Sequence, residues 1–154
     1  MKKQPISPVE AIFLKRTQNI YGDMKRRAKK EFKEVPFTIS GFREWLNSTF
    51  DTGAASSGVV RCAYSGIMLT IEQLEIDHQT PTSRGGSFDF GNLAVCSKEE
   101  NLRKGMLTAF EYSCLGGVIN TFPHEIAQSI WRSLQVGDVQ RFAHFRRMNK
   151  KRKS

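Results

Sequence analysis

Two short strand-like segments, separated by a loop with three glycines and a proline, most constrain the fold of this 154-residue chain. Residues 74–78 have the composition of a strand, in which Ile76 and Asp77 would face opposite sides. Residues 92–96 form the second such segment, and residues 79–91 between them carry the turn-forming residues of a structured loop. We therefore predict a strand, a loop and a second strand over this segment.

A helix is predicted directly after the second strand-like segment. Ser97 can accept a hydrogen bond from the amide of Glu100, and the Glu100 side chain can return one, which is the capping-box pattern of a helix start. The helix is expected to extend to about Ser113 and to close at the Gly116-Gly117 pair. Ahead of these elements, residues 59–64 have the composition of another strand.

The rest of the chain is predicted to be mainly helical. An N-terminal helix is expected to begin after Ser7, which can cap it, and to run to about Lys33. A second, short helix is expected after Ser40, followed by a loop over residues 51–58. Two more helices are expected near the end of the chain, over residues 123–134 and from Asp138 onwards.

These elements predict an α+β fold in a single domain, since 154 residues suffice for one sizeable core but hardly for two. A basic helical extension is expected over residues 1–58 and a central α+β core over residues 59–113. The remaining residues, 114–154, are expected to form C-terminal helices with a basic tail. Helices would then flank the central core on both sides.

The net charge of +9 is distributed unevenly along the chain. Residues 1–33 hold ten Lys and Arg against three Asp and Glu, and residues 146–154 hold six against none. The 112 residues between them hold eight against twelve. A mildly acidic core between two strongly basic segments favours a polyanionic partner, of which nucleic acid is the commonest. Basic tails that only keep the chain soluble are the alternative.

Cysteine usage and hydropathy predict an intracellular, cytoplasmic protein. Cys62, Cys96 and Cys114 are odd in number and widely spaced, which argues against a disulfide framework and favours free, buried thiols. No apolar run approaches the roughly 20 residues of a membrane span, and no signal-peptide core follows the first residues. We therefore expect no membrane association.

Three polar residues of the central segment have the types that phosphodiester hydrolysis needs. The reaction requires a general base for the attacking water and a cation beside the phosphate. His78 suits the base, because the unperturbed pKa of imidazole is about 6.5. Asp77 and Asn101 offer hard oxygen ligands, which suit Mg²⁺ and leave room for water and phosphate oxygens. Since adjacent strand residues face opposite ways, Asp77 and His78 are expected to serve different partners.

Five motifs over residues 59–110 resemble those of the HNH endonucleases, also called His-Me finger or ββα-metal nucleases. In order they are Cys-x-x-Ser-Gly from Cys62, the Asp77-His78 pair, Pro-x-Ser-x-Gly-Gly from Pro81, Asn92-Leu93, and Asn-x-x-Lys-Gly from Asn101. Several ordered motifs are far more specific than an isolated Asp-His pair. The resemblance implies a ββα-metal core flanked by N-terminal and C-terminal helices.

The resemblance also implies a role for each residue of the motifs. His78 would activate water, Asp77 and Asn101 would hold one Mg²⁺ or Mn²⁺ ion, and Asn92 would orient the loop that fixes His78. The substrate would be DNA, cut to leave 5′-phosphate and 3′-hydroxyl ends. Analogy with the family further suggests a phage or mobile-element enzyme, acting in a bacterial or phage-infected host cell.

Cationic residues are expected to hold the DNA backbone. Lys104 lies three residues after Asn101, and therefore on nearly the same face of the predicted helix. Arg84, in the loop, is a second candidate. The flanking basic segments supply the other candidates, which are Lys25, Arg26, Arg27, Arg146, Arg147, Lys150 and Lys151.

The cysteines depart from the family pattern. Many members carry two Cys-x-x-Cys knuckles that hold a structural zinc, but here Ser65 follows Cys62 and Glu99 follows Cys96 at the knuckle spacing. A zinc ion bound by four thiolates is therefore excluded, and both cysteines are expected to pack as small apolar residues. A metal site that combines the two cysteines with a histidine is the alternative.

Two other functions fit the same residues. One is a structure-selective or strand-nicking nuclease, because a single site cuts one strand and a double-strand break needs a dimer or two visits. The sequence leaves this choice and the oligomeric state open. The other is a non-catalytic nucleic-acid-binding module on the same scaffold, against which the intact Asp77, His78 and Asn101 argue.

Overall fold

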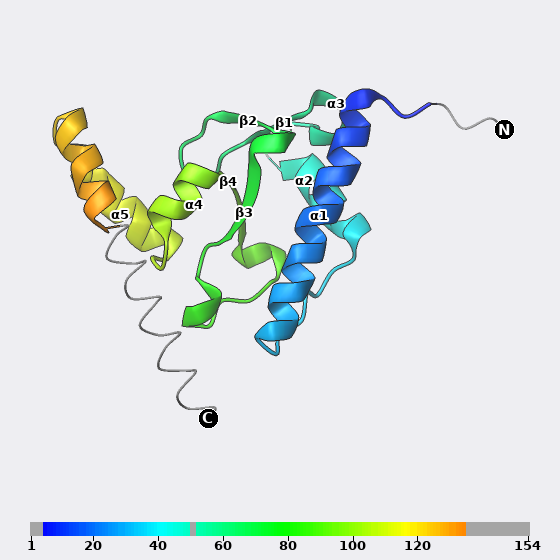
Figure 1. Ribbon diagram of the computed structural model, residues 1–154, viewed down its shortest axis with the longest axis horizontal. Coiled ribbons are helices and arrows are strands. Elements are labelled where there is room, and N and C mark those ends of the chain that lie inside the picture. Colours follow the sequence, from blue (N-terminus) through cyan, green and yellow to red (C-terminus); the bar gives the residue numbers. More distant parts are fainter. Residues whose placement is uncertain (1–4, 50–51, 135–154) are drawn as a thin grey trace. The chain divides into compact units, whose positions relative to one another are not determined.

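Helices and two short pairs of strands make up the described part of this chain in its computed structural model (Figure 1). The structure describes residues 5–49 and 52–134. Two compact units make up the chain, residues 1–101 and residues 102–154. The helix expected from Asp138 and the basic tail lie outside the described residues.

The first unit opens with its longest helix, α1 (Pro8–Lys30). Ser7 caps α1 as predicted, because its hydroxyl accepts a hydrogen bond from the Glu10 amide at 3.1 Å. The helix continues through Gly22 and ends three residues before the predicted limit at Lys33. One side of α1 enters the core through its buried residues, which are Phe13, Thr17, Ile20, Met24 and Ala28.

Two shorter helices follow, α2 (Ile39–Ser48) and α3 (Ala54–Ser57). The predicted cap of α2 was wrong, because the hydroxyl of Thr38, not of Ser40, accepts the hydrogen bond of the Gly41 amide at 3.2 Å. The segment predicted as a loop contains α3, a single turn of helix. Glycines with positive φ angles bound this turn on both sides, which allows so short a helix to start and stop.

The strands form two antiparallel pairs. β1 (Val59–Arg61) pairs with β2 (Met68–Thr70), and β3 (Leu74–His78) pairs with β4 (Leu93–Ser97). The sequence predicted β3 and β4 to within one residue, but not β2, which at three residues is too short to display alternation. β1 ends three residues early because residues 62–66 form a turn, closed by the Gly66 amide and the Cys62 carbonyl at 2.9 Å.

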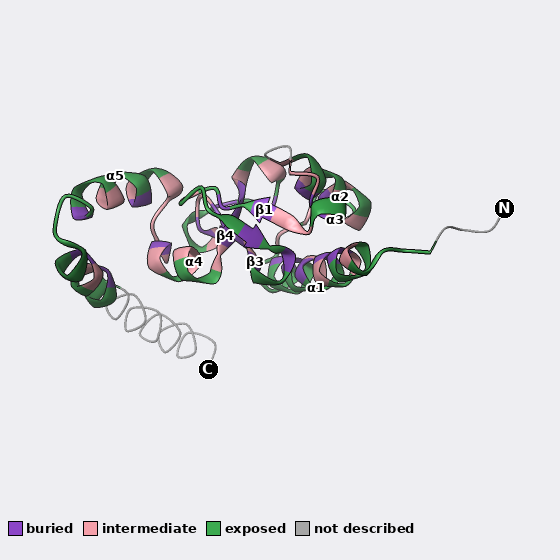
Figure 2. Ribbon diagram, turned by 90° about the horizontal axis from the view of Figure 1, so that it is seen from above, coloured by how far each residue is buried: buried purple, intermediate pink, exposed green. Residues whose placement is uncertain are grey.

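Apolar side chains from α1, α2 and all four strands form the core of the first unit. Figure 2 colours the buried residues purple along the ribbon. Cys62 and Cys96 are buried in it as free thiols, as predicted. The prediction of a buried thiol was wrong for Cys114, which is exposed on the second unit. Phe90, from the loop before β4, stacks on Phe37 and Trp45 with ring centroids 4.1 and 5.3 Å apart. This contact joins the loop to the region of α2.

The helix after β4 is interrupted. α4 (Lys98–Lys104) starts where predicted, since the Glu100 amide donates to the Ser97 hydroxyl at 3.2 Å. A residue with a φ of 52°, Gly105, follows it, and Thr108 then begins a new capping box with Glu111. The prediction of one helix to Ser113 was therefore wrong.

The second unit contains α5 (Ala109–Ile119) and a helix over residues 124–134, the latter as predicted. Their aromatic rings meet at Tyr112 and Trp131, with centroids 5.3 Å apart. Gly116 and Gly117, which were expected to close the preceding helix, lie inside α5. The end of the central core that was expected at residue 113 lies inside α5 as well. Within the described residues, no helix combines the length and the apolar character that crossing a membrane demands.

Candidate active site

Asp77 and His78 are the last two residues of β3, and β4 pairs with both. Asp77 lies opposite Ala94 and His78 opposite Leu93, while the Gln79 amide extends the ladder by donating to the Asn92 carbonyl at 2.7 Å. Only 8% of Asp77 and 3% of His78 are exposed. Since regular pairing persists to the end of the strand, the two side chains face opposite sides and meet different neighbours.

The neighbour of Asp77 is Tyr64, in the turn after β1. The Tyr64 hydroxyl donates a hydrogen bond to the Oδ2 atom of Asp77 at 2.5 Å. Burial, together with this hydrogen bond and the negative charge of Asp77, raises the pKa of Tyr64 far above its ordinary value. Tyr64 therefore stays protonated and remains a donor that fixes one oxygen of the carboxylate.

The neighbour of His78 is Phe88, in the loop between β3 and β4. The two rings meet edge to face, with centroids 4.6 Å apart and planes inclined by 78°. Phe88 is itself only 1% exposed, so it forms a fixed wall on one side of the imidazole. The position of the loop thus determines the surroundings of His78.

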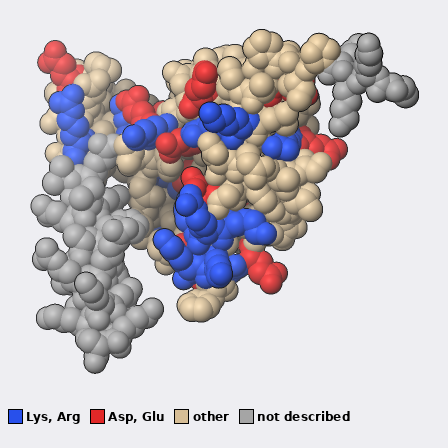
Figure 3. All heavy atoms as spheres, turned by 45° about the vertical axis from the view of Figure 1, so that its right-hand side comes forward, with Lys and Arg blue, Asp and Glu red and all other residues tan. Residues whose placement is uncertain are grey.

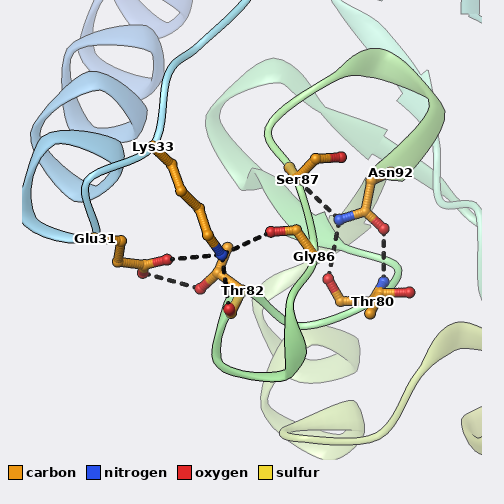
Figure 4. Close-up of polar contacts among 7 residues, drawn as sticks. All are labelled: Glu31, Lys33, Thr80, Thr82, Gly86, Ser87 and Asn92. Atoms are coloured by element: carbon orange, nitrogen blue, oxygen red, sulfur yellow. Dashed lines mark hydrogen bonds and ion pairs between the residues drawn. The ribbon is translucent and has the colours of Figure 1, made fainter.

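Asn92 holds this loop together, as Figure 4 shows. Its Oδ1 atom accepts a hydrogen bond from the Thr80 amide at 2.8 Å, and its Nδ2 atom donates to the carbonyls of Thr80 and Ser87, each at 2.9 Å. Asn92, at the end of the loop, is therefore bonded both to Thr80 near the start of the loop and to Ser87, seven positions after Thr80. Removing this side chain would leave backbone groups without these partners.

Gly86 lets the loop close this tightly. A Cβ atom on Gly86 would lie 1.8 Å from the Thr80 carbonyl oxygen and 2.8 Å from the Nδ2 atom of Asn92. No side chain fits at such distances, because the nearest neighbour is backbone. The second residue of the Gly-Gly motif, Gly86, therefore has to be glycine for steric reasons.

Asn101 lies on α4 and contacts β3. Its Nδ2 atom donates to the Oε2 atom of Glu75 at 2.9 Å. Glu75 precedes Asp77 by two residues and shares its face of the strand, because side chains alternate along β3. With its nitrogen held by Glu75, the amide group of Asn101 turns its carbonyl oxygen away from that carboxylate.

The oxygen atoms on this side of β3 fit a hard divalent cation. A carboxylate from Asp77 and a carboxamide oxygen from Asn101 are the ligand types that Mg²⁺ takes, with waters completing its coordination. Across the described residues 5–49 and 52–134, no group of three or more His, Cys, Asp and Glu side chains could hold a metal ion. Asp77 and Asn101 thus offer oxygen ligands, the type that a hard cation prefers.

The predicted phosphate contacts differ in their exposure. Lys25, Arg26 and Arg27 are exposed on the second half of α1, and Arg84 is exposed at the end of a short 3-10 helix in the loop. In Figure 3 several Lys and Arg side chains gather in a patch, whereas others lie apart from it on the same face. Lys104 is fully buried, so its ammonium group is not on the described surface. The other predicted contacts, Arg146, Arg147, Lys150 and Lys151, lie outside the described residues.

Strand, loop, strand and helix thus follow in the order expected of a ββα core, with the Asp-His pair at the end of its first strand. Residues 62–110 match the family model described as HNH endonuclease. The resemblance to the HNH endonucleases and the α+β fold class are confirmed over this segment of the chain. The match supports a nuclease that acts on nucleic acid. A search of curated proteins finds no match to this chain.

Sequence reasoning missed residues that contact the predicted ones. Tyr64 lies inside the Cys-x-x-Ser-Gly motif, but nothing in the sequence links it to Asp77, thirteen residues away. Glu75 could have been found, since spacing by two residues places it on the same strand face as Asp77. Glu31 and Lys33, which bind the loop in Figure 4, were counted only as part of the charged N-terminal segment.

Proposed function

We propose that this protein is a metal-dependent endonuclease that hydrolyses phosphodiester bonds of DNA. The observation that carries the proposal is the joint position of two groups at the end of β3. The Asp77 carboxylate is held by Tyr64, and the His78 imidazole is packed on Phe88, each on its own side of the strand. An acid-base group and an anionic oxygen ligand on adjacent residues are what hydrolysis of a phosphodiester requires.

His78 acts as the general base in this proposal. The imidazole takes a proton from water as the water oxygen forms a bond to phosphorus, and the bond from phosphorus to the 3′ oxygen breaks. The departing oxygen then takes a proton from solvent, which leaves a 3′-hydroxyl and a 5′-phosphate. A general base that is positioned in this way contributes about 10²- to 10⁴-fold to the rate.

Asp77 and Asn101 hold the cation, which is Mg²⁺ or Mn²⁺. When bound, this ion supplies positive charge beside the phosphate and leaving oxygen. Tyr64 and Glu75 orient the two ligands, because each hydrogen bond fixes which oxygen is presented. Arg84 and the three cations in the second half of α1, Lys25, Arg26 and Arg27, contact the flanking phosphates, and their attraction to DNA weakens as salt rises.

The substrate class is tested with three labelled oligonucleotides of one sequence, a DNA duplex, a DNA single strand and an RNA. Incubation with Mg²⁺ is expected to cleave DNA and to leave ends that a phosphatase followed by a kinase can relabel. Cleavage of RNA alone would replace DNA by RNA as the substrate. If none of the three is cut with Mg²⁺ or Mn²⁺, the catalytic proposal fails and a binding module remains.

Replacing Tyr64 by phenylalanine tests how the cation site is held. The variant loses one hydrogen bond to a buried carboxylate, which costs about 1–3 kcal/mol of stability. The Mg²⁺ concentration that gives half-maximal cleavage is expected to rise about 10- to 100-fold, as for other residues behind a metal ligand. Cleavage at a series of Mg²⁺ concentrations measures the change, and an unaltered requirement would rule out this role.

A further inference from the structure

Lys33 follows α1 but points into the loop between β3 and β4. Its Nζ atom donates to the carbonyl oxygens of Thr82 at 2.8 Å and Gly86 at 2.9 Å, and it lies 3.5 Å from a carboxylate oxygen of Glu31 (Figure 4). An ammonium group has three donors, and these are three acceptors. This cation is therefore bound by groups of the protein, although its side chain is only partly buried.

The backbone turn that directs Lys33 to the loop is conformationally costly. Phe32 has a φ of 56°, in the left-handed region that a residue with a side chain enters at a cost of about 1–2 kcal/mol. The Lys33 amide closes the turn by donating to the Ala28 carbonyl at 2.9 Å. Phe32 is 95% exposed, so packing of its own ring does not offset this cost. This bond and the positive φ angle are those of a Schellman helix end, formed here with a phenylalanine at the position that glycine usually takes.

Glu31 adds a second connection from the same turn. Its Oε1 atom accepts a hydrogen bond from the Thr82 hydroxyl at 2.9 Å. The loop is thus held from two sides, by the Glu31 and Lys33 side chains on one side and by the Asn92 side chain on the other. Glu31 and Lys33 hold the loop at Thr82 and Gly86, whereas Asn92 joins its two ends.

We propose that Lys33 is a positioning residue, which acts through the loop to hold the active site in its working shape. The loop leaves His78 at one end and brings Phe88 back against the imidazole at the other. By holding the middle of the loop at Thr82 and Gly86, Lys33 also fixes the position of Phe88 against the imidazole. The same contact ties the loop to the end of α1, whose exposed cations would hold DNA. The effect of Lys33 on catalysis rests on the proposed nuclease activity, whereas its hold on the loop does not depend on that activity.

The test compares Lys33→Met with Lys15→Met, which removes the same charge from an exposed position on the first half of α1. With saturating DNA and Mg²⁺, the single-turnover cleavage rate of Lys33→Met is expected to fall about 10- to 100-fold, since small displacements at an active site have effects of this size. DNA affinity is expected to match that of Lys15→Met, which cleaves at the wild-type rate. Lys33→Arg, which keeps the charge and donors, is expected to recover part of the rate.

Hydrogen exchange provides a readout that does not depend on activity. The amides of Arg84 and Gly86 both donate to the Pro81 carbonyl within the loop. In Lys33→Met they are expected to exchange faster, whereas strand amides of β3 and β4 keep their protection. A wild-type cleavage rate in Lys33→Met, or unchanged exchange at these two amides, would overturn the positioning role. If the wild type itself does not cleave, the nuclease proposal fails, and the exchange result still decides whether Lys33 holds the loop.

Discussion

Replacing His78 by alanine is expected to slow DNA cleavage about 10²- to 10⁴-fold, the range for loss of a positioned general base. The imidazole is buried at the end of β3 against Phe88. His78 is the one residue that we propose as the general base. Single-turnover rates with saturating DNA and Mg²⁺ measure the effect on the chemical step. DNA affinity should change little, because His78 is not one of the cationic phosphate contacts.

His124→Ala is the matched control for this variant. His124 is exposed at the start of the helix over residues 124–134, where its Nε2 atom lies 2.8 Å from the Gln128 amide nitrogen. Its loss should leave the cleavage rate at the wild-type value. Cleavage by His78→Ala within about threefold of the wild type, well short of the effect of a general base, would refute the catalytic assignment.

Replacing Gly86 by alanine is expected to damage both stability and activity. The added Cβ would lie 1.8 Å from the Thr80 carbonyl oxygen, so the backbone of the loop has to move. That movement weakens the bonds that Asn92 and Lys33 make to the loop, and we expect the unfolding free energy to fall by about 2–4 kcal/mol. Cleavage should fall at least about 100-fold, because Phe88 and His78 lose their relative position.

Gly22→Ala provides the comparison. Gly22 lies in the middle of α1 with no atom within 4 Å of an added Cβ, so alanine is expected to stabilise the helix by about 0.5–1 kcal/mol. Chemical denaturation and cleavage assays on both variants separate the steric effect from the general effect of adding a methyl group. Wild-type stability and activity in Gly86→Ala would show that the loop closes in another way.

Local signals made the order of elements around the site predictable. Ser7 and Ser97 are helix caps whose side chains act within three residues, and the five-residue patterns of β3 and β4 are long enough to identify strands. The capping box of Thr108 and Glu111 has the same pattern and could have revealed the break after α4. β2, with three residues, carries too little pattern to identify.

Contacts between distant segments could not be predicted from a single sequence. Lys33 meets Gly86 across 53 positions, and nothing local separates it from the exposed lysines of α1. Tyr64 reaches Asp77 only because the turn after β1 lies beside β3. Motifs indicated the residues of the site, whereas folding determines which partners orient them. The burial of Lys104 could not be predicted either, because its position on the helix does not reveal which residues cover it.

One divalent cation, held by Asp77 and Asn101, is expected to enable this protein to cut DNA. The most direct test of this expectation is the conversion of supercoiled plasmid by protein freed of metal with EDTA. Open-circular or linear DNA is expected only after Mg²⁺ or Mn²⁺ is added in excess of the chelator, and Asp77→Ala should remain inactive at every concentration. Cleavage that persists in EDTA, or equal cleavage by Asp77→Ala, would contradict the account.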